Sequence, residues 1–274
     1  MSDGCTNDTF PISRQKAVVF MTIVSVGGNM GVHHIGVDEA GRGPSIGPLV
    51  VCALSIPRGD RVILTDLGVD DSKNLTKTRR ESIHSEIIAI SESRDWEIGL
   101  IHCDAESIDL WMESGTLNSL EVRAFADAIA KVTEGSLEFN LFLDACDVDA
   151  ERFGRNVSST LGGLGGDCRV FSKHRMDSED VVTGAASIIA KVNRDWAMEK
   201  LSRELGIDLG SGYPSDPKSK IAVEDLCRGD PPPECLRRKW KNVERAWVAH
   251  HQKSIPSRVN GTPSGVQSAL DEWN

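Results

Sequence analysis

The feature that most constrains the fold is an alternation of strand-like and helix-like segments, which begins near residue 32. Apolar and β-branched runs predict strands, whereas apolar residues spaced three to four positions apart predict helices. Strands are expected at residues 34–37, 49–56, 96–102, 139–143 and 168–172. Helices are expected at residues 76–90, 116–132, 150–161 and 179–205, the last of which could be interrupted. This order of elements predicts an α/β fold.

Composition describes an ordinary globular chain with an acidic balance. The 274 residues could form one large domain or two small ones, and 39% of them are hydrophobic and 26% charged. The net charge of −10 is unexpected for a protein that binds nucleic acid, because phosphate binding depends on lysine and arginine. Local basic groups could still line a track on this acidic body, the alternative being solvated side chains that point in different directions. These groups are Arg42, then Lys73, Lys77, Arg79 and Arg80, then Lys173 and Arg175, and finally Arg237, Arg238, Lys239 and Lys241.

Cysteine usage and the N-terminal segment bear on location. Seven cysteines without a C-x-x-C pair argue against a complete disulfide framework, so we expect a reducing cytoplasm. The apolar stretch at residues 17–26 is too short to span a membrane, and no convincing signal-peptide cleavage site follows it. Residues 1–29 are interpreted as a disordered extension or a misassigned start, since Met30 stands just before the first motif. The adjacent pairs His33-His34 and His250-His251 are interpreted as surface residues.

The run GVDEAGRGP at residues 36–44 carries the clearest chemical signal. Asp38 and Glu39 fall near the end of a short strand, where Gly41 and Gly43 allow a sharp turn and a close approach to a ligand. Two neighbouring carboxylates repel each other unless a cation or a proton lies between them, and hard divalent cations prefer such oxygens. The run therefore suggests metal-assisted chemistry on a phosphate backbone. The alternative is a solvated acidic strand end, since carboxylates are mostly exposed.

The same run, continuing into SIGPLVVCAL, resembles the opening of ribonuclease HII, and further motifs of that family follow in order. They are DSKNL at residues 71–75, LDA at 143–145, KHRMD at 173–177, AASIIAKV at 185–192 with Arg194-Asp195, and GSGYPSDP at 210–217. The resemblance covers about residues 34 to 241 and is closest to the archaeal single-chain type. It implies a ribonuclease H-like mixed sheet flanked by helices, with a small helical C-terminal part.

The resemblance also implies the organisation of the chain. We expect a catalytic domain at residues 30–210 and a C-terminal helical part with a substrate-binding loop at 211–252. A Pro-rich break at residues 230–233 precedes a short helix in that part. Residues 253–274, rich in Ser, Pro, Gly and Asn, are interpreted as a flexible tail. We expect a monomer without a membrane segment.

In the family the acidic positions bind two divalent ions, normally Mg²⁺ or Mn²⁺, and act as catalytic residues. The resemblance places this role on Asp38, Glu39, Asp144 and Asp177. Two metals cleave by in-line displacement and leave a 5′-phosphate and a 3′-hydroxyl. Asp177 keeps the family spacing to the AASIIAKV run, although Ser178-Glu179-Asp180 departs from the neutral run expected there. Nearby acids that compete for the same assignment are Asp147, Asp149, Glu179 and Asp180.

The implied activity is endonucleolytic hydrolysis of RNA in RNA–DNA hybrids, with cuts on the 5′ side of ribonucleotides, including single ones in duplex DNA. Recognition of the 2′-hydroxyl separates RNA from DNA. By resemblance, Gly41, Arg42 and Gly43 contact this hydroxyl and the neighbouring phosphates, and Tyr213 stacks at the junction with the following deoxynucleotide. Lys73 is expected to contact phosphate near the cut. Ser187 and Lys191 are expected only to hold their helix in place.

The last eight residues resemble the Q-x-x-L-x-x-aromatic peptide by which replication proteins bind a sliding clamp. Gln267, Leu270 and Trp273 match it, and Asn274 stands where a second aromatic residue is usual. A flexible linker before an anchored peptide suits a tethered partner, and the alternative is an incidental tail. Two rival functions also stay open. A different two-metal nuclease would ignore the 2′-hydroxyl, and a binding module without catalysis would have lost acidic positions.

Overall fold

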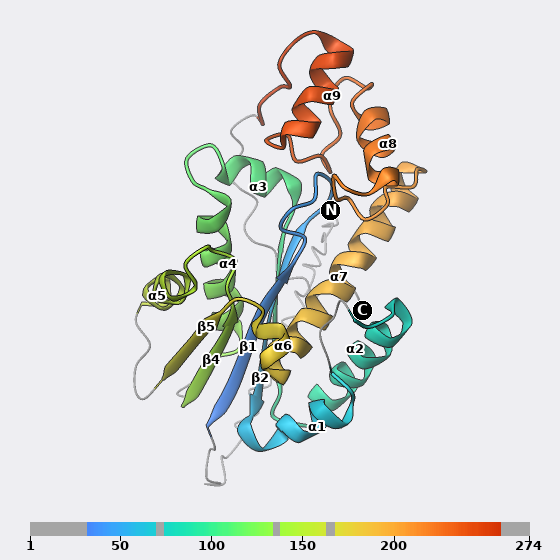
Figure 1. Ribbon diagram of the computed structural model, residues 1–274. Coiled ribbons are helices and arrows are strands. Elements are labelled where there is room, and N and C mark those ends of the chain that lie inside the picture. The colour runs from blue at the N-terminus through green and yellow to red at the C-terminus, as the bar shows by residue number, and fades with distance from the viewer. Residues whose placement is uncertain (1–31, 70–73, 134–137, 163–167, 259–274) are drawn as a thin grey trace, which may run out of the picture. The chain divides into compact units, whose positions relative to one another are not determined.

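A computed structural model describes residues 32–69, 74–133, 138–162 and 168–258 of the chain (Figure 1). Its centre is a five-stranded sheet in the order β3-β2-β1-β4-β5. The strands are β1 (His33–Ala40), β2 (Leu49–Pro57), β3 (Glu97–Cys103), β4 (Phe139–Asp144) and β5 (Arg169–Lys173). β1, β2 and β3 pair antiparallel, whereas β4 is parallel to β1 and β5 is parallel to β4. The sheet is therefore mixed, and the chain has an α/β fold.

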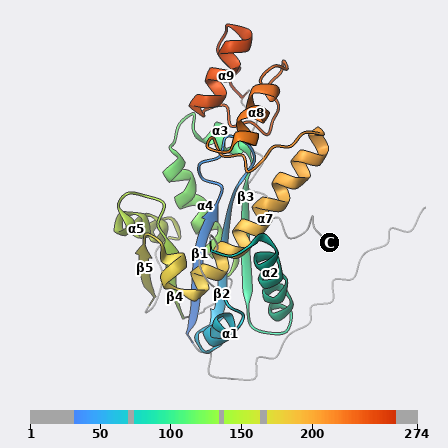
Figure 2. The same ribbon diagram turned by 45° about the vertical axis from the view of Figure 1, so that its right-hand side comes forward.

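Helices cover both faces of this sheet, as the two views show (Figures 1 and 2). One face packs against α1 (Arg61–Asp66), α2 (Lys77–Ser91) and the long α7 (Val181–Leu205). The other packs against α3 (Ala105–Trp111), α4 (Leu117–Lys131) and α5 (Ala150–Thr160). The first eight residues of β2 are consequently buried without alternation, as expected for a strand with a core on each side.

Helix α7 lies directly on the central strand β1. Asp180 caps its first turn by accepting hydrogen bonds from the backbone N–H groups of Val182 and Thr183, each at 3.0 Å. A Cβ atom at Gly36 would lie 2.3 Å from the backbone nitrogen of Thr183, so only glycine permits this approach. The helix runs unbroken to Leu205, while residues 176–179, part of which the sequence assigned to it, form the separate short helix α6 (Met176–Glu179).

The C-terminal residues add α8 (Pro217–Leu226) and α9 (Lys241–His251). A separate apolar cluster joins these helices to Met198 of α7 and to Ile46, which follows β1. Backbone pairing reinforces the contact, since Ile46 forms a bridge with Leu236 and the N–H of Gly47 donates to the carbonyl of Cys235 at 2.9 Å. Ile46 and Gly47 are thus held by the C-terminal residues.

Most expected elements are present, and a few expectations were wrong. The strands and the four long helices match within a few residues, but the short helices α1 and α3 were not anticipated. His33 and His34 were interpreted as surface residues, yet they are 4% and 8% exposed because β1 is a central strand. In the described part of the chain, no helix combines the length and the apolar character needed to cross a membrane.

Candidate active site

Three of the predicted carboxylates converge on the α7 side of the sheet. Asp38 lies near the end of β1, Asp144 ends β4, and Asp177 lies in α6, which follows β5. The neighbouring parallel strands β1 and β4 bring the first two together, and Asp144 Oδ1 accepts a hydrogen bond from the N–H of Met176 at 3.0 Å, which positions α6. Each aspartate offers one oxygen, and the three oxygens lie within 4.8 Å of one another.

Burial makes this cluster electrostatically costly. Asp38 and Asp177 are each only 4% exposed. Burial, followed by the negative charges of Glu39 and Asp144, raises the pKa of Asp38 well above its usual range. Ser187 of α7 acts in the opposite direction through a hydrogen bond to Asp38, so this serine does more than hold its helix. Three close carboxylate oxygens under mutual repulsion fit a hard divalent cation, which would offset their charge.

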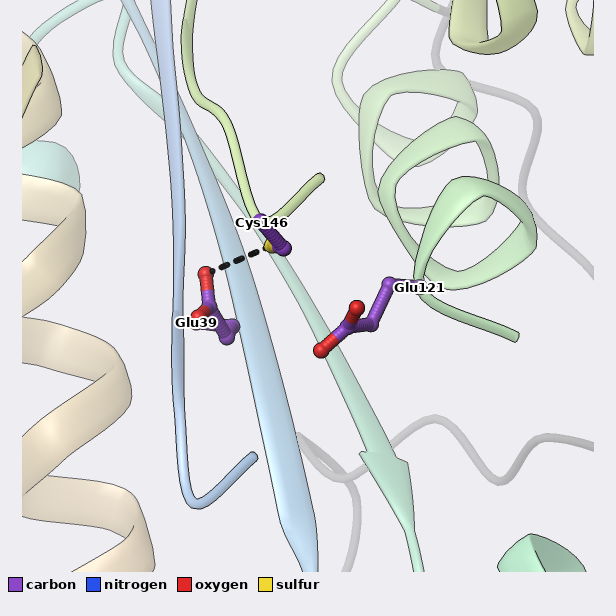
Figure 3. Close-up of side chains that lie close together, drawn as sticks. All are labelled: Glu39, Glu121 and Cys146. Atoms are coloured by element: carbon purple, nitrogen blue, oxygen red, sulfur yellow. Dashed lines mark hydrogen bonds between the residues drawn. The ribbon is translucent and has the colours of Figure 1, made fainter. Parts of the chain in front are cut away.

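Glu39 follows Asp38 near the end of β1, and a side-chain hydrogen bond between the two carboxyl groups also raises the pKa of Asp38. Glu39 is at the same time part of a second group with Glu121 of α4 and Cys146, whose side chains turn toward one another (Figure 3). The Cys146 thiol lies 3.2 Å from Glu39 Oε2. The structure therefore brings Asp38, Asp144 and Asp177 together and places Glu39 in this adjacent group.

Glu121 was not anticipated as a site residue. Its side chain is fully buried, and burial followed by the charge of Glu39 raises its pKa to about 8, although Arg42 acts in the opposite direction. Arg42 pairs with Glu121 through Nη1 and donates to Asn118 Oδ1 through Nη2 at 2.8 Å. A signal was present in the sequence, because Glu121 occupies the inward face of the predicted helix, next to Leu120 and four residues before Phe125.

The competing acids have structural partners. Asp147 and Asp149 lie just before α5, Glu179 is the last residue of α6, and Asp180 links α6 to α7. Their contacts are Asp147 with Arg152 at 2.6 Å, Asp149 with the N–H of Arg152 at 2.9 Å, Glu179 with Lys173 at 2.7 Å, and Asp180 with Arg61 at 2.7 Å. None of the four belongs to either candidate metal group among the described residues.

The glycine-rich turn and the tyrosine loop meet. Gly41 adopts φ of 93°, where a side chain is strained, and a Cβ atom on Gly43 would lie 3.5 Å from Cε1 of Tyr213. The N–H of Ser45 donates to the carbonyl of Gly212 at 2.8 Å and joins the two segments. Tyr213 is 37% exposed, so its ring is open to a ligand.

Asp216 fixes the shape of the tyrosine loop. Its Oδ2 accepts from the N–H of Ser211 at 2.7 Å and from the Ser211 hydroxyl at 2.8 Å. These hydrogen bonds lower the pKa of Asp216 to about 2, so the carboxylate stays charged and holds the loop at neutral pH. Asp216 therefore stabilises the conformation of the GSGYPSDP loop by hydrogen bonds within the motif.

The remaining predicted residues are the lysines, the C-terminal tail and the basic track. Lys73 and the tail residues Gln267, Leu270 and Trp273 lie outside the described residues. Lys191, expected to hold its helix, pairs with Asp195 one turn later. The expected basic track is largely paired or buried: Arg42 pairs with Glu121, Lys77 with Glu199, Arg80 with Asp195 and Lys173 with Glu179, and Arg237 is fully buried.

Comparison with known proteins agrees with this geometry. Residues 35–243 match the family model described as ribonuclease HII. The chain is 40% identical over 214 residues to ribonuclease HII of Pyrococcus furiosus, which covers 77% of this chain and 89% of the relative.

Two solved structures share the fold at 33% sequence identity. Ribonuclease H2 of Pyrococcus horikoshii matches with a TM-score of 0.68 over 81% of this chain and 100% of that one. The ribonuclease HII in a complex with PCNA from Archaeoglobus fulgidus matches with a TM-score of 0.67 over 77% of this chain and 96% of that one. The chain is a ribonuclease H endonuclease and belongs to the ribonuclease HII family.

Proposed function

We propose that this protein hydrolyses RNA paired with DNA and cuts on the 5′ side of ribonucleotides, including a single ribonucleotide in duplex DNA. The observation that carries the proposal is the convergence of Asp38, Asp144 and Asp177 on one side of the sheet. Asp38 comes three residues before a turn that packs against Tyr213. Acidic groups for hydrolysis and a turn suited to recognising ribose are therefore parts of one site.

The three aspartates, with Glu39 as the fourth ligand, would hold two divalent cations, Mg²⁺ or Mn²⁺. Once bound, such ions supply an activated water and stabilise the departing 3′-oxygen, which leaves a 5′-phosphate and a 3′-hydroxyl. The protein contributes fixed positions for these carboxylates. Asp144 is held by the N–H of Met176, and Asp38 Oδ1 accepts from the N–H of Glu39 at 2.7 Å. Their geometry is thus set before substrate arrives.

Recognition would come from Gly41, Arg42, Gly43 and Tyr213. The exposed Gly43 offers its backbone to the 2′-hydroxyl at a point where no side chain intervenes, and the ring of Tyr213 stacks on the adjacent sugar or base. Arg42, held by Glu121 and Asn118, presents a fixed guanidinium. Lys73 would contact the phosphate near the cut.

Cleavage of a labelled DNA duplex that holds one ribonucleotide tests this function with Mg²⁺ and with Mn²⁺. Wild type is expected to cut on the 5′ side of the ribonucleotide and to leave an all-DNA duplex intact. Asp177→Asn is expected to lose the activity, whereas Glu179→Gln, from the same short helix but paired with the exposed Lys173, is expected to keep it. A wild type that leaves the ribonucleotide duplex intact, or that cuts the all-DNA duplex, contradicts the proposal.

We also propose that Gln267, Leu270 and Trp273 bind a sliding clamp. The complex of the Archaeoglobus fulgidus relative with PCNA supports this partner. Full-length protein is expected to bind purified clamp in a titration, and Leu270→Ala with Trp273→Ala is expected to abolish binding. Cleavage of a short linear duplex without clamp serves as the control and should be unchanged. Equal clamp binding by wild type and the double variant argues against the peptide.

A further inference from the structure

The carbonyl groups of the glycine-rich turn, residues 41–43, are all held from one side. Arg237 donates through Nη2 to the carbonyl of Gly41 at 2.6 Å and through Nη1 to that of Arg42 at 2.9 Å. Trp240 donates through Nε1 to the carbonyl of Gly43 at 3.1 Å. Three consecutive carbonyls of this turn are therefore bonded by two side chains from the segment before α9.

This arrangement fixes where the turn points its donors. In a trans peptide unit the N–H and C=O groups point in opposite directions, and the peptide bonds of this turn are trans. Because Arg237 holds the carbonyls of Gly41 and Arg42, the N–H groups of Arg42 and Gly43 face away from it. Successive N–H groups turned to one side form a concavity that favours an anion or an acceptor oxygen. Arg237 thus orients the donors that the proposed function assigns to the substrate.

A second arginine couples this turn to the tyrosine loop. Arg194 of α7 is 1% exposed and donates through Nη2 to the carbonyl of Ser211 at 2.9 Å. A Cβ atom would lie 2.2 Å from Arg194 Nε if placed on Gly41 and 3.1 Å from its Nη2 if placed on Gly212. Its Cζ also lies 5.4 Å from the centroid of the Tyr213 ring. The guanidinium is thus packed between a glycine of each segment.

Neither arginine has an ion-pair partner within the described ranges, and their hydrogen bonds run to backbone carbonyls. Burying a cation without a carboxylate is unfavourable. Burial, followed by the charge of Arg194, accordingly lowers the pKa of Arg237 to about 9, so the group remains charged at neutral pH. Two buried positive charges beneath the turn also favour phosphate in a chain whose net charge is −10.

We propose that Arg237 and Arg194 are positioning residues for ribose recognition, which hold the glycine-rich turn and the Tyr213 loop as one unit and thereby set the preference for a ribonucleotide over a deoxynucleotide. This inference rests on the proposed function. Arg237→Lys keeps the charge but cannot bond the carbonyls of Gly41, Arg42 and Gly47 together, because lysine lacks the planar fork of donors. Loss of the hydrogen bonds from Arg237 should disorder the N–H donors of the glycine-rich turn without removing a metal ligand.

The test compares the KM of a single-ribonucleotide duplex with the inhibition constant of an unlabelled all-DNA duplex of the same sequence. The ratio of the inhibition constant to KM measures discrimination and needs no cleavage of DNA. Arg237→Lys and Arg194→Lys are each expected to reduce this ratio by about tenfold, the effect of one lost hydrogen-bonded contact or more. Trp240→Phe removes only the bond from this partly buried side chain to the carbonyl of Gly43, so it is expected to reduce the ratio less and to fold normally.

Arg258→Lys is the matched control. Arg258 is also buried and donates to the carbonyls of Glu234 and Leu236, but it pairs with Asp109 and has no bond to the turn. Its variant should lose thermal stability and keep the wild-type ratio within about twofold. An unchanged ratio in folded Arg237→Lys and Trp240→Phe, or an equal loss in Arg258→Lys, overturns the inference. A wild type that does not cleave the ribonucleotide duplex instead overturns the proposed function.

Discussion

Asp38 illustrates at the scale of one residue how the site is poised for a cation. Its folded pKa lies well above the usual value, so at neutral pH its ionisation opposes folding when no metal is bound. Asn is nearly the same shape and still accepts the hydrogen bond from the N–H of Glu39. The charge of Asp38, and not the packing of its side chain, therefore destabilises the metal-free fold.

Asp38→Asn should accordingly stabilise the metal-free protein at pH 7 while abolishing cleavage. We expect a gain on the order of 1 kcal/mol, or about 2–4 °C in the melting temperature, because a buried repulsive charge is removed. Thermal unfolding in the presence of EDTA measures this gain. Asp147→Asn is the control, because it breaks the ion pair with Arg152 at the start of α5 and should lower the melting temperature or leave it unchanged. A lower melting temperature for Asp38→Asn contradicts the repulsion argument.

Glu121 makes the stability of the folded protein depend on pH in a defined direction. Its pKa is raised from 4.5 to about 8 in the folded state. Between these values the unfolded chain has lost the proton and the folded chain has kept it, so stability falls as pH rises from about 4.5 to about 8. Without metal, the melting temperature of Glu121→Gln relative to wild type should rise across this window and level off above it. A difference that is constant between pH 5 and pH 9 speaks against the shift.

At the scale of elements, the contact of α7 with β1 controls both the core and the site. Asp38 and Gly36 lie on the same face of β1, and the backbone of α7 crosses at Gly36. Any displacement of α7 also displaces Asp180, which caps it, and hence α6 with Asp177. The packing of one glycine is therefore connected to the arrangement of the carboxylates.

Gly36→Ala should destabilise the protein by about 3 kcal/mol, because the added Cβ atom would lie 2.3 Å from the backbone nitrogen of Thr183. Urea unfolding measures the loss, and Mg²⁺ affinity should weaken in the same variant. Gly59→Ala is the control, since a Cβ atom there meets nothing within 4 Å. Equal stability of the two variants would mean that α7 adjusts without strain.

The elements also show which parts of the site were predictable. Asp38 and Asp144 could be placed because each lies at or near the end of a strand whose apolar pattern is local, and the motif order located Asp177 in the fold. Glu39 could not be assigned to the group of Glu121 and Cys146, because the contacts that form this group span 82 and 107 residues of sequence and arise only in the folded chain. Arg237 was expected on a basic track, yet its acceptors in the glycine-rich turn are supplied only by tertiary packing.

At the scale of the whole molecule, the proposed metal binding would be linked to folding. The carboxylates of Asp38, Asp144 and Asp177 come from distant parts of the sequence, and only the folded sheet and α6 gather them within 4.8 Å. The unfolded chain offers no comparable group of oxygens, so a cation held by this cluster would bind the native state preferentially. Such a ligand stabilises the native state by about 2.7 kcal/mol at one hundred times its dissociation constant.

Adding Mg²⁺ or Mn²⁺ to metal-free wild type should therefore raise its melting temperature with a logarithmic dependence on concentration. Asp144→Asn removes one charge and one ligand oxygen, so we expect its melting temperature to respond much less at the same concentration. Asp149→Asn, an acid that caps α5 nearby, should respond like wild type, which separates specific binding from general screening of the net charge of −10. If Asp144→Asn gains as much as wild type, the cation is acting on the acidic surface, and the aspartate cluster does not hold it.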